Sequence, residues 1–258
     1  MIGSAWLWLV PLLAGSPAAG PVPTPAPVLS EAAARQSLGN VKPFFIRNTG
    51  QYPEDVDFYF KGRRGNVFLT GEGMVYDFIR EVAPTEPGEE TDALPGKDGT
   101  APPSFERLVF RLRLRGADPA ASAAGEKELP GKINYFIGPQ TEWRTGIPTY
   151  EEVVYRRIWP GVDLRYVFRE GSPRPRLEIS PGADPAAAAF DFAGVKSVSV
   201  DADGALNLET AFGVFREPPL RAWQEEGKPV PAVRVADGES GYSIRAQEFD
   251  PALPLFIE

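Results

Sequence analysis

The chemistry open to this chain is limited by two residue types that it lacks. Among its 258 residues there is no Cys and no His. Thiol nucleophiles, disulfides, Cys/His zinc sites, Ser-His-Asp triads and imidazole acid–base catalysis each require one of them. These classes of site are therefore excluded, and the sequence predicts neither a metal site nor a cofactor.

A pair of carboxylates is the remaining route to acid–base catalysis, as in glycoside hydrolysis. Asp163, Glu178 and Asp191 lie in or beside strand-like segments and could converge in the fold. The chain contains 35 acidic residues, so some acids near strands are expected by chance. Surface or turn positions explain these three residues better, and we assign no catalytic residue.

The segment Trp143–Phe168, WRTGIPTYEEVVYRRIWPGVDLRYVF, concentrates aromatic and Arg residues. Aromatic rings can stack on sugar rings while guanidinium groups donate hydrogen bonds. The alternative is two core strands joined by a turn at Trp159-Pro160-Gly161, because Leu164 and Tyr166 alternate with polar residues. We favour core packing. The ligand-binding alternative comprises Trp143, Arg144, Tyr150, Tyr155, Trp159 and Arg165.

A second candidate surface is the run RLVFRLRLR, which alternates Arg with apolar residues. A cationic stripe on one strand face could bind an acidic glycan or a nucleic acid. A solvated outer face is the commoner explanation, and the net charge of −8 argues against nucleic acid. The residues of this stripe are Arg107, Arg111, Arg113 and Arg115.

Two polar motifs are interpreted as turns. Asp203-Gly204 connects two alternating apolar runs, as in a hairpin. An EF-hand register would place Ser199 and Thr210 at the first and last ligand positions, and neither is a carboxylate. In FIRNTGQY, we expect Gly50 to shape a turn while the amides, that of Asn48 among them, bond to the loop backbone.

Strands must position these residues, because the apolar period from Val41 onward is mostly two. Short alternating runs bounded by Gly, Pro, Asp or Asn are typical of an all-β antiparallel sandwich. We predict a β-sandwich domain over residues 41–258, built as one sandwich or as two stacked halves. The stretch around Tyr150 also fits a helical period, but its β-branched and aromatic residues favour a strand.

Two segments interrupt the alternation. Residues 81–104 hold six acids and one Lys and are rich in Pro, which predicts a mobile surface insertion. This insertion carries a net charge of −5 out of the chain's −8, so the low isoelectric point says little about partners. Residues 117–131, ADPAASAAGEKELPG, predict a second loop.

The first forty residues predict export. Residues 1–18 contain an uncharged apolar run that is too short to span a bilayer and is followed by small residues, so we expect a signal peptide cleaved after Ala18. Residues 19–40 read as a Pro/Ala-rich linker with one short helix from Ser30 to Gly39. No membrane span is expected after cleavage. The expected location is extracytoplasmic: secreted, at the cell surface or in the periplasm.

Six motifs follow one another along the chain: FFIRNTGQYPEDVDFYFKG, NYFIGPQTEWRTGIPTYEEVVYRRIWPGVDLRYVF, LEISPGADPAAAAFDFAG, DADGALNLET, AWQEEGKPVP and PLFIE. In this order they resemble the N-terminal domain of bacterial SBBP-type β-propeller-repeat proteins, over roughly residues 43–258. The resemblance implies a β-rich extracytoplasmic module that normally precedes a propeller, and it brings no catalytic residues. Such domains run on into propeller repeats, whereas this sequence ends at Ile257-Glu258, so it is either a stand-alone relative or a copy that stops at the domain boundary. Its acidic insertion is also long.

Three functional hypotheses result. The first is an exported, non-catalytic structural or interaction module of the bacterial cell surface or secreted fraction. Its expected partners are a β-propeller, in the same chain or separate, or a surface glycan, and nucleic acid is not among them. The second is a carbohydrate-binding domain that uses the segment Trp143–Phe168. The third is a His-independent glycoside hydrolase.

Overall fold

The structure is a computed structural model that describes residues 42–63, 65–82 and 104–258. These residues belong to one compact unit, Lys42–Glu258. The predicted signal peptide, the linker and the short helix lie outside the described residues, and so does most of the acidic insertion. Strand β4 includes the first two residues of that predicted insertion, and strand β5 begins at its last residue, Ser104.

The described chain is built almost entirely of strands, with three short 3-10 helices at Gln140–Glu142, Pro185–Ala187 and Glu225–Gly227. The strands are β1 (Phe45–Arg47), β2 (Val56–Gly62), β3 (Gly65–Thr70), β4 (Gly73–Val82), β5 (Ser104–Arg115), β6 (Ala123–Tyr135), β7 (Arg144–Trp159), β8 (Val162–Arg169), β9 (Ser172–Ile179), β10 (Ala189–Ala193), β11 (Ser197–Val200), β12 (Leu206–Thr210), β13 (Gly213–Glu217), β14 (Ala222–Trp223), β15 (Pro229–Val230), β16 (Ala232–Asp237), β17 (Gly241–Ala246) and β18 (Leu255–Ile257).

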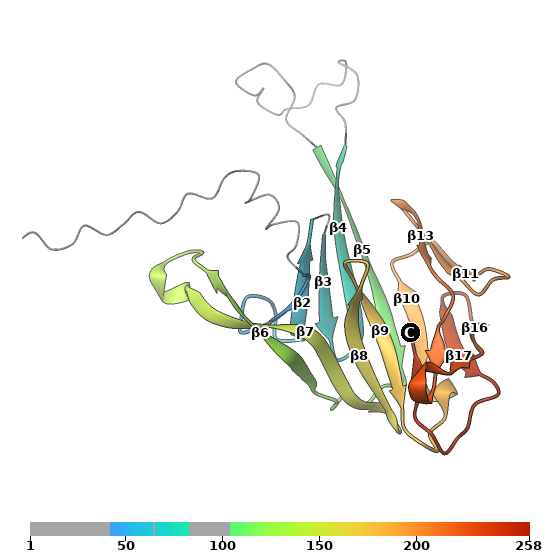
Figure 1. Ribbon diagram of the computed structural model, residues 1–258. Coiled ribbons are helices and arrows are strands. Elements are labelled where there is room, and N and C mark those ends of the chain that lie inside the picture. Colours follow the sequence, from blue (N-terminus) through green and yellow to red (C-terminus); the bar gives the residue numbers. More distant parts are fainter. Residues whose placement is uncertain (1–41, 64, 83–103) are drawn as a thin grey trace, which may run out of the picture. The chain divides into compact units, whose positions relative to one another are not determined.

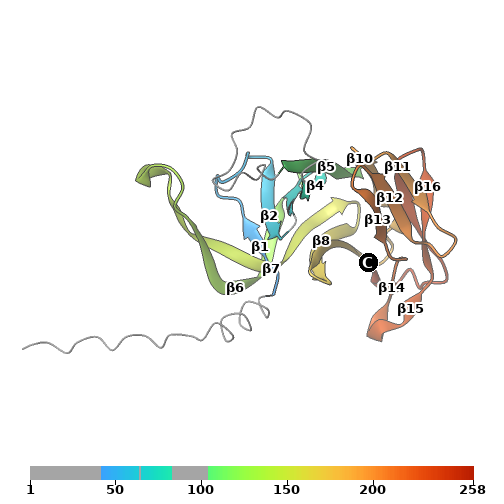
Figure 2. The same ribbon diagram turned by 90° about the horizontal axis from the view of Figure 1, so that it is seen from above.

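Fifteen strands form one antiparallel sheet in the order β15-β14-β18-β9-β8-β7-β1-β2-β3-β4-β5-β10-β17-β16, with β6 paired to β7. This sheet curls into a nearly closed, barrel-like arrangement (Figures 1 and 2). Strands β11, β12 and β13 form a separate small sheet. The structure confirms the all-β, antiparallel prediction. The predicted sandwich of two stacked sheets is not observed, because the hydrogen-bonded pairing of strands continues without a break around the curled sheet.

Strand β7 makes this curl possible, because it has three neighbours. Tyr150 pairs with β1 and with β6, whereas Val153 pairs with β8 and with β6. A strand has only two edges, so β1 and β8 share one edge of β7 and β6 occupies the other. The ambiguous stretch around Tyr150 is therefore a strand, as its β-branched and aromatic residues predicted.

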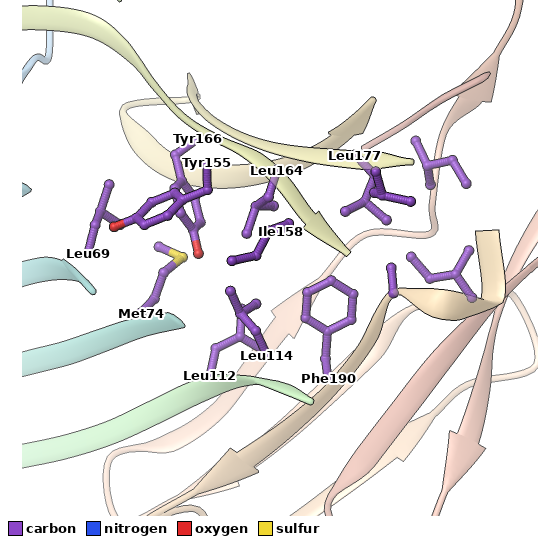
Figure 3. Packing of buried hydrophobic residues seen from close by; sticks show 14 of the residues in the cluster. Leu69, Met74, Leu112, Leu114, Tyr155, Ile158, Leu164, Tyr166, Leu177 and Phe190 are labelled. Carbon is purple, nitrogen blue, oxygen red and sulfur yellow. The ribbon is translucent and has the colours of Figure 1, made fainter. Parts of the chain in front are cut away.

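The core lies inside the curled sheet. Alternation is clearest in β5, where Leu108, Phe110, Leu112 and Leu114 are buried and the intervening residues are exposed. Figure 3 shows side chains from opposite parts of the sheet meeting in the interior, among them Met74, Tyr155 and Phe190. Apolar residues of almost every strand join this cluster, so the burial of one face drives the folding of the unit.

The predicted loop at 117–131 is wrong over most of its length, because strand β6 begins at Ala123. Its Gly, Pro and charged residues favour a loop locally, but pairing with β7 determines its conformation. The pairing is irregular, with register shifts between Glu128 and Lys132 and near Ile133. Tertiary contacts here override local propensity.

Two predicted turns are confirmed. Asp203-Gly204 lies in the turn between β11 and β12, and Gly204 has φ +85°. The Asn48 amide donates to the backbone carbonyls of Tyr52, Pro53 and Val56, while its oxygen accepts from the backbone N–H of Gly50. The half-buried Asn48 side chain thus holds the loop before β2 in place through its hydrogen bonds.

Candidate functional site

The predicted aromatic segment forms part of the core. Tyr155 and Trp159 are buried, and Tyr150 is nearly so. The Trp159 Nε1 donates to the backbone carbonyl of Arg115 at 2.8 Å, and the Tyr155 hydroxyl donates to Asp57 Oδ2 at 2.8 Å. Burial raises the pKa of Tyr155, which keeps the phenol neutral. The packing interpretation is confirmed for these three rings, which offer no exposed face to a sugar.

The two Arg residues of the predicted binding set lie apart from each other. Arg165 is surrounded by three carboxylates: it contacts Glu126, lies 3.0 Å from Glu152 Oε2 and donates from Nε to Glu178 Oε1 at 2.7 Å. Arg144 is half-buried beside Gly50, where an added Cβ would lie 2.8 Å from its Nη2. The donors of Arg165 are therefore already used within the protein.

Trp143 is the exception, because its side chain is exposed. It packs edge-on against Phe136, with ring centroids 5.0 Å apart, at the end of the β6–β7 hairpin. Exposed fractions are 43% for Trp143, 60% for Phe136 and 71% for Ile137. We call these three residues the apolar tip. The hairpin that carries it extends away from the other strands in both views (Figures 1 and 2).

The three candidate carboxylates do not converge. Asp163 and Glu178 face each other across β8 and β9, but Asp191 lies on β10 opposite Arg113. Glu178 is held by Arg165, and Asp163 accepts from the backbone N–H of Arg157 at 2.6 Å. No group of three or more acidic residues in the described part of the chain could hold a metal ion.

A different feature stands out as a site: a hollow of about 660 Å3 that opens from the inside of the curled sheet. Its walls come from β2–β5 on one side and from the β8–β9 turn and the small sheet on the other. We call it the aromatic cleft, after its ring-bearing residues Phe60, Tyr76, Phe78, Phe110 and Phe215.

The rings of the aromatic cleft pack on one another. Tyr76 stacks on Phe110 with centroids 4.5 Å apart, and Phe78 stacks on Phe215 at 5.4 Å. Phe110 is fully buried, while the other three remain half-buried and so present ring surface to the hollow. A concave, mostly apolar hollow of this size with a few polar groups is typical of ligand sites.

A second hollow of about 270 Å3 adjoins the aromatic cleft, and the two share Glu170, Arg174 and Glu217. We call it the arginine pocket. Its floor consists of core residues, including Phe190 and Tyr242. Burial raises the pKa of Tyr242 to about 12, so that this phenol is uncharged at neutral pH.

Glu217 lies between two guanidinium groups where the hollows meet. Arg174 Nη1 donates to Glu217 Oε1 at 2.9 Å, and Arg234 Nη2 lies 3.5 Å from Oε2. Arg234 is buried, its side chain only 6% exposed, and its Nη1 donates to the backbone carbonyls of Gly204 and Pro218. Its Nε has no hydrogen-bond partner among the described residues. The site thus combines aromatic walls with a net positive centre.

The amino-acid sequence alone does not predict this site. Its residues come from β2 to β5, β8 to β10, β12, β13 and β16 to β18, and Arg174, Glu217 and Arg234, which form its ionic centre, are far apart in the sequence. The alternation in each strand indicates which residues point inward, and the charged residue Arg234 at an inward position of β16 is an available signal. Without the order of the strands, however, these positions could not be brought together.

The comparisons with known proteins place the chain in a family. A family described as a domain of unknown function, DUF7948, matches residues 45–258. The chain belongs to the DUF7948 family. No curated protein and no solved structure gives a significant match.

The DUF7948 match covers every strand from β1 to β18, and with them both hollows and the apolar tip. The family description carries no activity, so the function has to be argued from the site itself. The relation to SBBP-type proteins stays a prediction. A membrane-crossing helix is not found in the described ranges of this DUF7948 domain.

Proposed function

We propose that this DUF7948 domain is an exported, non-catalytic binding module of the bacterial cell surface or secreted fraction, and that it holds a saccharide in the aromatic cleft. The observation that carries the proposal is the cleft itself, a hollow of about 660 Å3 with half-buried rings on its walls. Sugar rings have apolar C–H faces that pack on aromatic rings, while their hydroxyls need polar partners. The shared residues Glu170, Arg174 and Glu217 supply such partners.

A second function is favoured by the apolar tip: contact with another protein. Three large apolar side chains exposed together are unusual on a free surface and mark interaction sites. The tip is tied to the fold where β6 ends, because Tyr135, directly before Phe136, is joined to Tyr59 of β2 through hydroxyls 2.9 Å apart. A β-propeller, the partner implied by the SBBP resemblance, is the protein that we propose for this contact.

The saccharide proposal is tested with a panel of immobilised oligosaccharides and three proteins: the wild type, Phe215→Leu and Trp143→Ala. We expect saturable binding by the wild type and by Trp143→Ala. Phe215→Leu should bind about fivefold more weakly, because a stacked ring contributes on the order of 1 kcal/mol. Thermal unfolding of each variant checks that the fold is retained.

If Trp143→Ala lost saccharide binding while Phe215→Leu kept the wild-type affinity, the saccharide site would lie at the apolar tip. Absence of binding to every saccharide would contradict the proposal. Release of reducing sugar, abolished by Glu178→Gln, would contradict the non-catalytic part and restore the hydrolase hypothesis.

A further inference from the structure

We propose that the saccharide bound by the aromatic cleft is an acidic one, and that its carboxylate binds Arg174 in exchange for Glu217. This inference rests on the proposed function, because it specifies the ligand of the same cleft. It depends on the ionic arrangement where the aromatic cleft meets the arginine pocket.

Arg174 is the basic residue that both hollows present to a ligand. Its side chain is 30% exposed, and it lines the aromatic cleft and the arginine pocket alike. Within the described structure its guanidinium makes one hydrogen bond, from Nη1 to Glu217. A guanidinium has five N–H donors in a planar fork that matches a carboxylate. Arg174 therefore has donors left for an incoming carboxylate.

Arg234 lies deeper and is incompletely satisfied. Backbone carbonyls fix its Nη1, so the group cannot turn freely. The opposite edge, Nε and Nη2, faces only a distant partner: Nη2 is 3.5 Å from Glu217 Oε2, and Nε has none among the described residues. A buried charged donor without a partner costs free energy. The Nε/Nη2 edge of Arg234, whose guanidinium also lies over the Tyr242 ring, thus has donors that a closer carboxylate would satisfy.

Glu217 can fill that position when it is released from Arg174. It already bridges the two guanidinium groups, with Oε1 on Arg174 and Oε2 towards Arg234. A ligand carboxylate that takes over Arg174 frees Glu217 to shift onto the Nε/Nη2 edge of Arg234. In the bound state Arg174 pairs with the ligand and Arg234 pairs closely with Glu217. In the free state only the Arg174–Glu217 pair is close, and the Arg234–Glu217 contact is long. A neutral ligand gives no such gain, because it cannot replace the charge of Glu217 on Arg174.

The aromatic walls and the ionic centre are close enough to act on one ligand. Phe215 and Glu217 lie two positions apart on β13, and both line the aromatic cleft. A saccharide ring packed on Phe215 can therefore place a ring carboxylate at Arg174. This combination of an apolar ring face and one carboxylate describes a uronic acid residue within an oligosaccharide.

The test compares matched pairs of oligosaccharides that differ only in charge: uronic-acid oligomers and their methyl esters, measured by isothermal titration calorimetry. We expect the free acid to bind the wild type at least about tenfold more tightly than its ester, as for a charge-assisted hydrogen bond to Arg. The preference should decrease at high salt, because the rim of the cleft is open to solvent.

Two variants of one ion pair should act in opposite directions. Arg174→Gln should lower the affinity for the acid much more than that for the ester, so that the preference for the acid disappears. Glu217→Gln should raise the affinity for the acid by about threefold or more, because no internal carboxylate then competes for Arg174. If the Arg174–Glu217 ion pair were purely structural, Arg174→Gln and Glu217→Gln would change the affinity for the acid in the same direction.

Equal binding of acid and ester by the wild type would overturn this inference and leave the proposed function standing. Weaker acid binding in Glu217→Gln, at unchanged thermal stability, would also overturn it. If neither the acids, nor their esters, nor neutral saccharides bound the wild type, the proposed function itself would be wrong.

Discussion

At the scale of single residues, the same side-chain types serve opposite roles on the two faces of the sheet. Arg165 on the outer face is neutralised by Glu126, Glu152 and Glu178, and no donor is left over for a ligand. The hydrogen bonds that Arg165 donates to Glu178 and Glu126 raise the pKa of its guanidinium further above its already high value. Arg234 on the inner face shares one carboxylate, and its Nε has no hydrogen-bond partner in the described part of the chain. Arg residues with unfilled donors, not Arg residues as such, indicate the site.

The first prediction concerns this outer network. Arg165→Leu should lower the free energy of unfolding by about 2–4 kcal/mol, because it leaves three carboxylates close together without their common cation. Arg156→Leu is the matched control: Arg156 contacts Glu126, but its side chain is 58% exposed, so the loss should stay under about 1 kcal/mol. Urea unfolding measures both. If both variants lost the same free energy of unfolding, burial would not be the reason why the ion pairs of Arg165 stabilise the fold.

At the scale of elements, strand β6 shows how packing selects residues in an irregular strand. Gly125 lies against the ring of buried Tyr150, where an added Cβ would be 2.5 Å from the ring carbon Cγ. Gly131, in the same strand, has nothing within 4 Å of such an atom. One glycine is thus required by a close approach, and the other is not.

The second prediction follows from this difference. Gly125→Ala should destabilise the protein by about 1–3 kcal/mol, because Tyr150 must move within a packed core. Gly131→Ala should change the stability by less than about 0.5 kcal/mol. Chemical denaturation of the two variants provides the comparison. If both substitutions were tolerated equally, the packing of β6 on Tyr150 would be looser than described.

The elements also show how far the sequence predicts the structure. Strands with strict alternation, such as β5, and turns with Gly at a positive φ, such as that at Gly204, follow from the sequence because their cause is local. Strand β6 does not, because its polar, Gly-containing composition becomes a strand only through pairing with β7. The candidate site is hidden for the same reason. Arg174, Glu217 and Arg234 meet only through the order of strands in space.

At the scale of the whole unit, one buried cluster links the first and last strands. It includes Phe45 of β1, Leu208 of the small sheet and Ile257 of β18. Regions that share a continuous core unfold together more often than those with separate cores. The small sheet is separate in its hydrogen bonding but not in its packing.

The third prediction is that residues 42–258 unfold in a single transition. Urea curves followed by far-ultraviolet circular dichroism, which reports the strands, should coincide with curves from the near-ultraviolet signal of the packed rings. The reason is that Phe215 of the small sheet packs against Phe78 and Phe110 of the large one. Two separated transitions would show that β11–β13 unfold independently.

The position of β18 has a consequence for how a newly made chain acquires this structure. Leu255–Ile257 pair with β9 on one side and with β14 on the other, so β14 and β15 reach the rest of the sheet only through β18, which follows every other strand of this unit in the sequence. Phe45 of β1 likewise cannot form its strand pairing until Tyr150, more than a hundred positions later in the chain, has been made. Contacts between distant residues form slowly. A chain whose synthesis has not yet passed Ile257 therefore lacks the pairing that joins β14 and β15 to the rest of the sheet, and the final assembly of this unit begins only once β18 has been made.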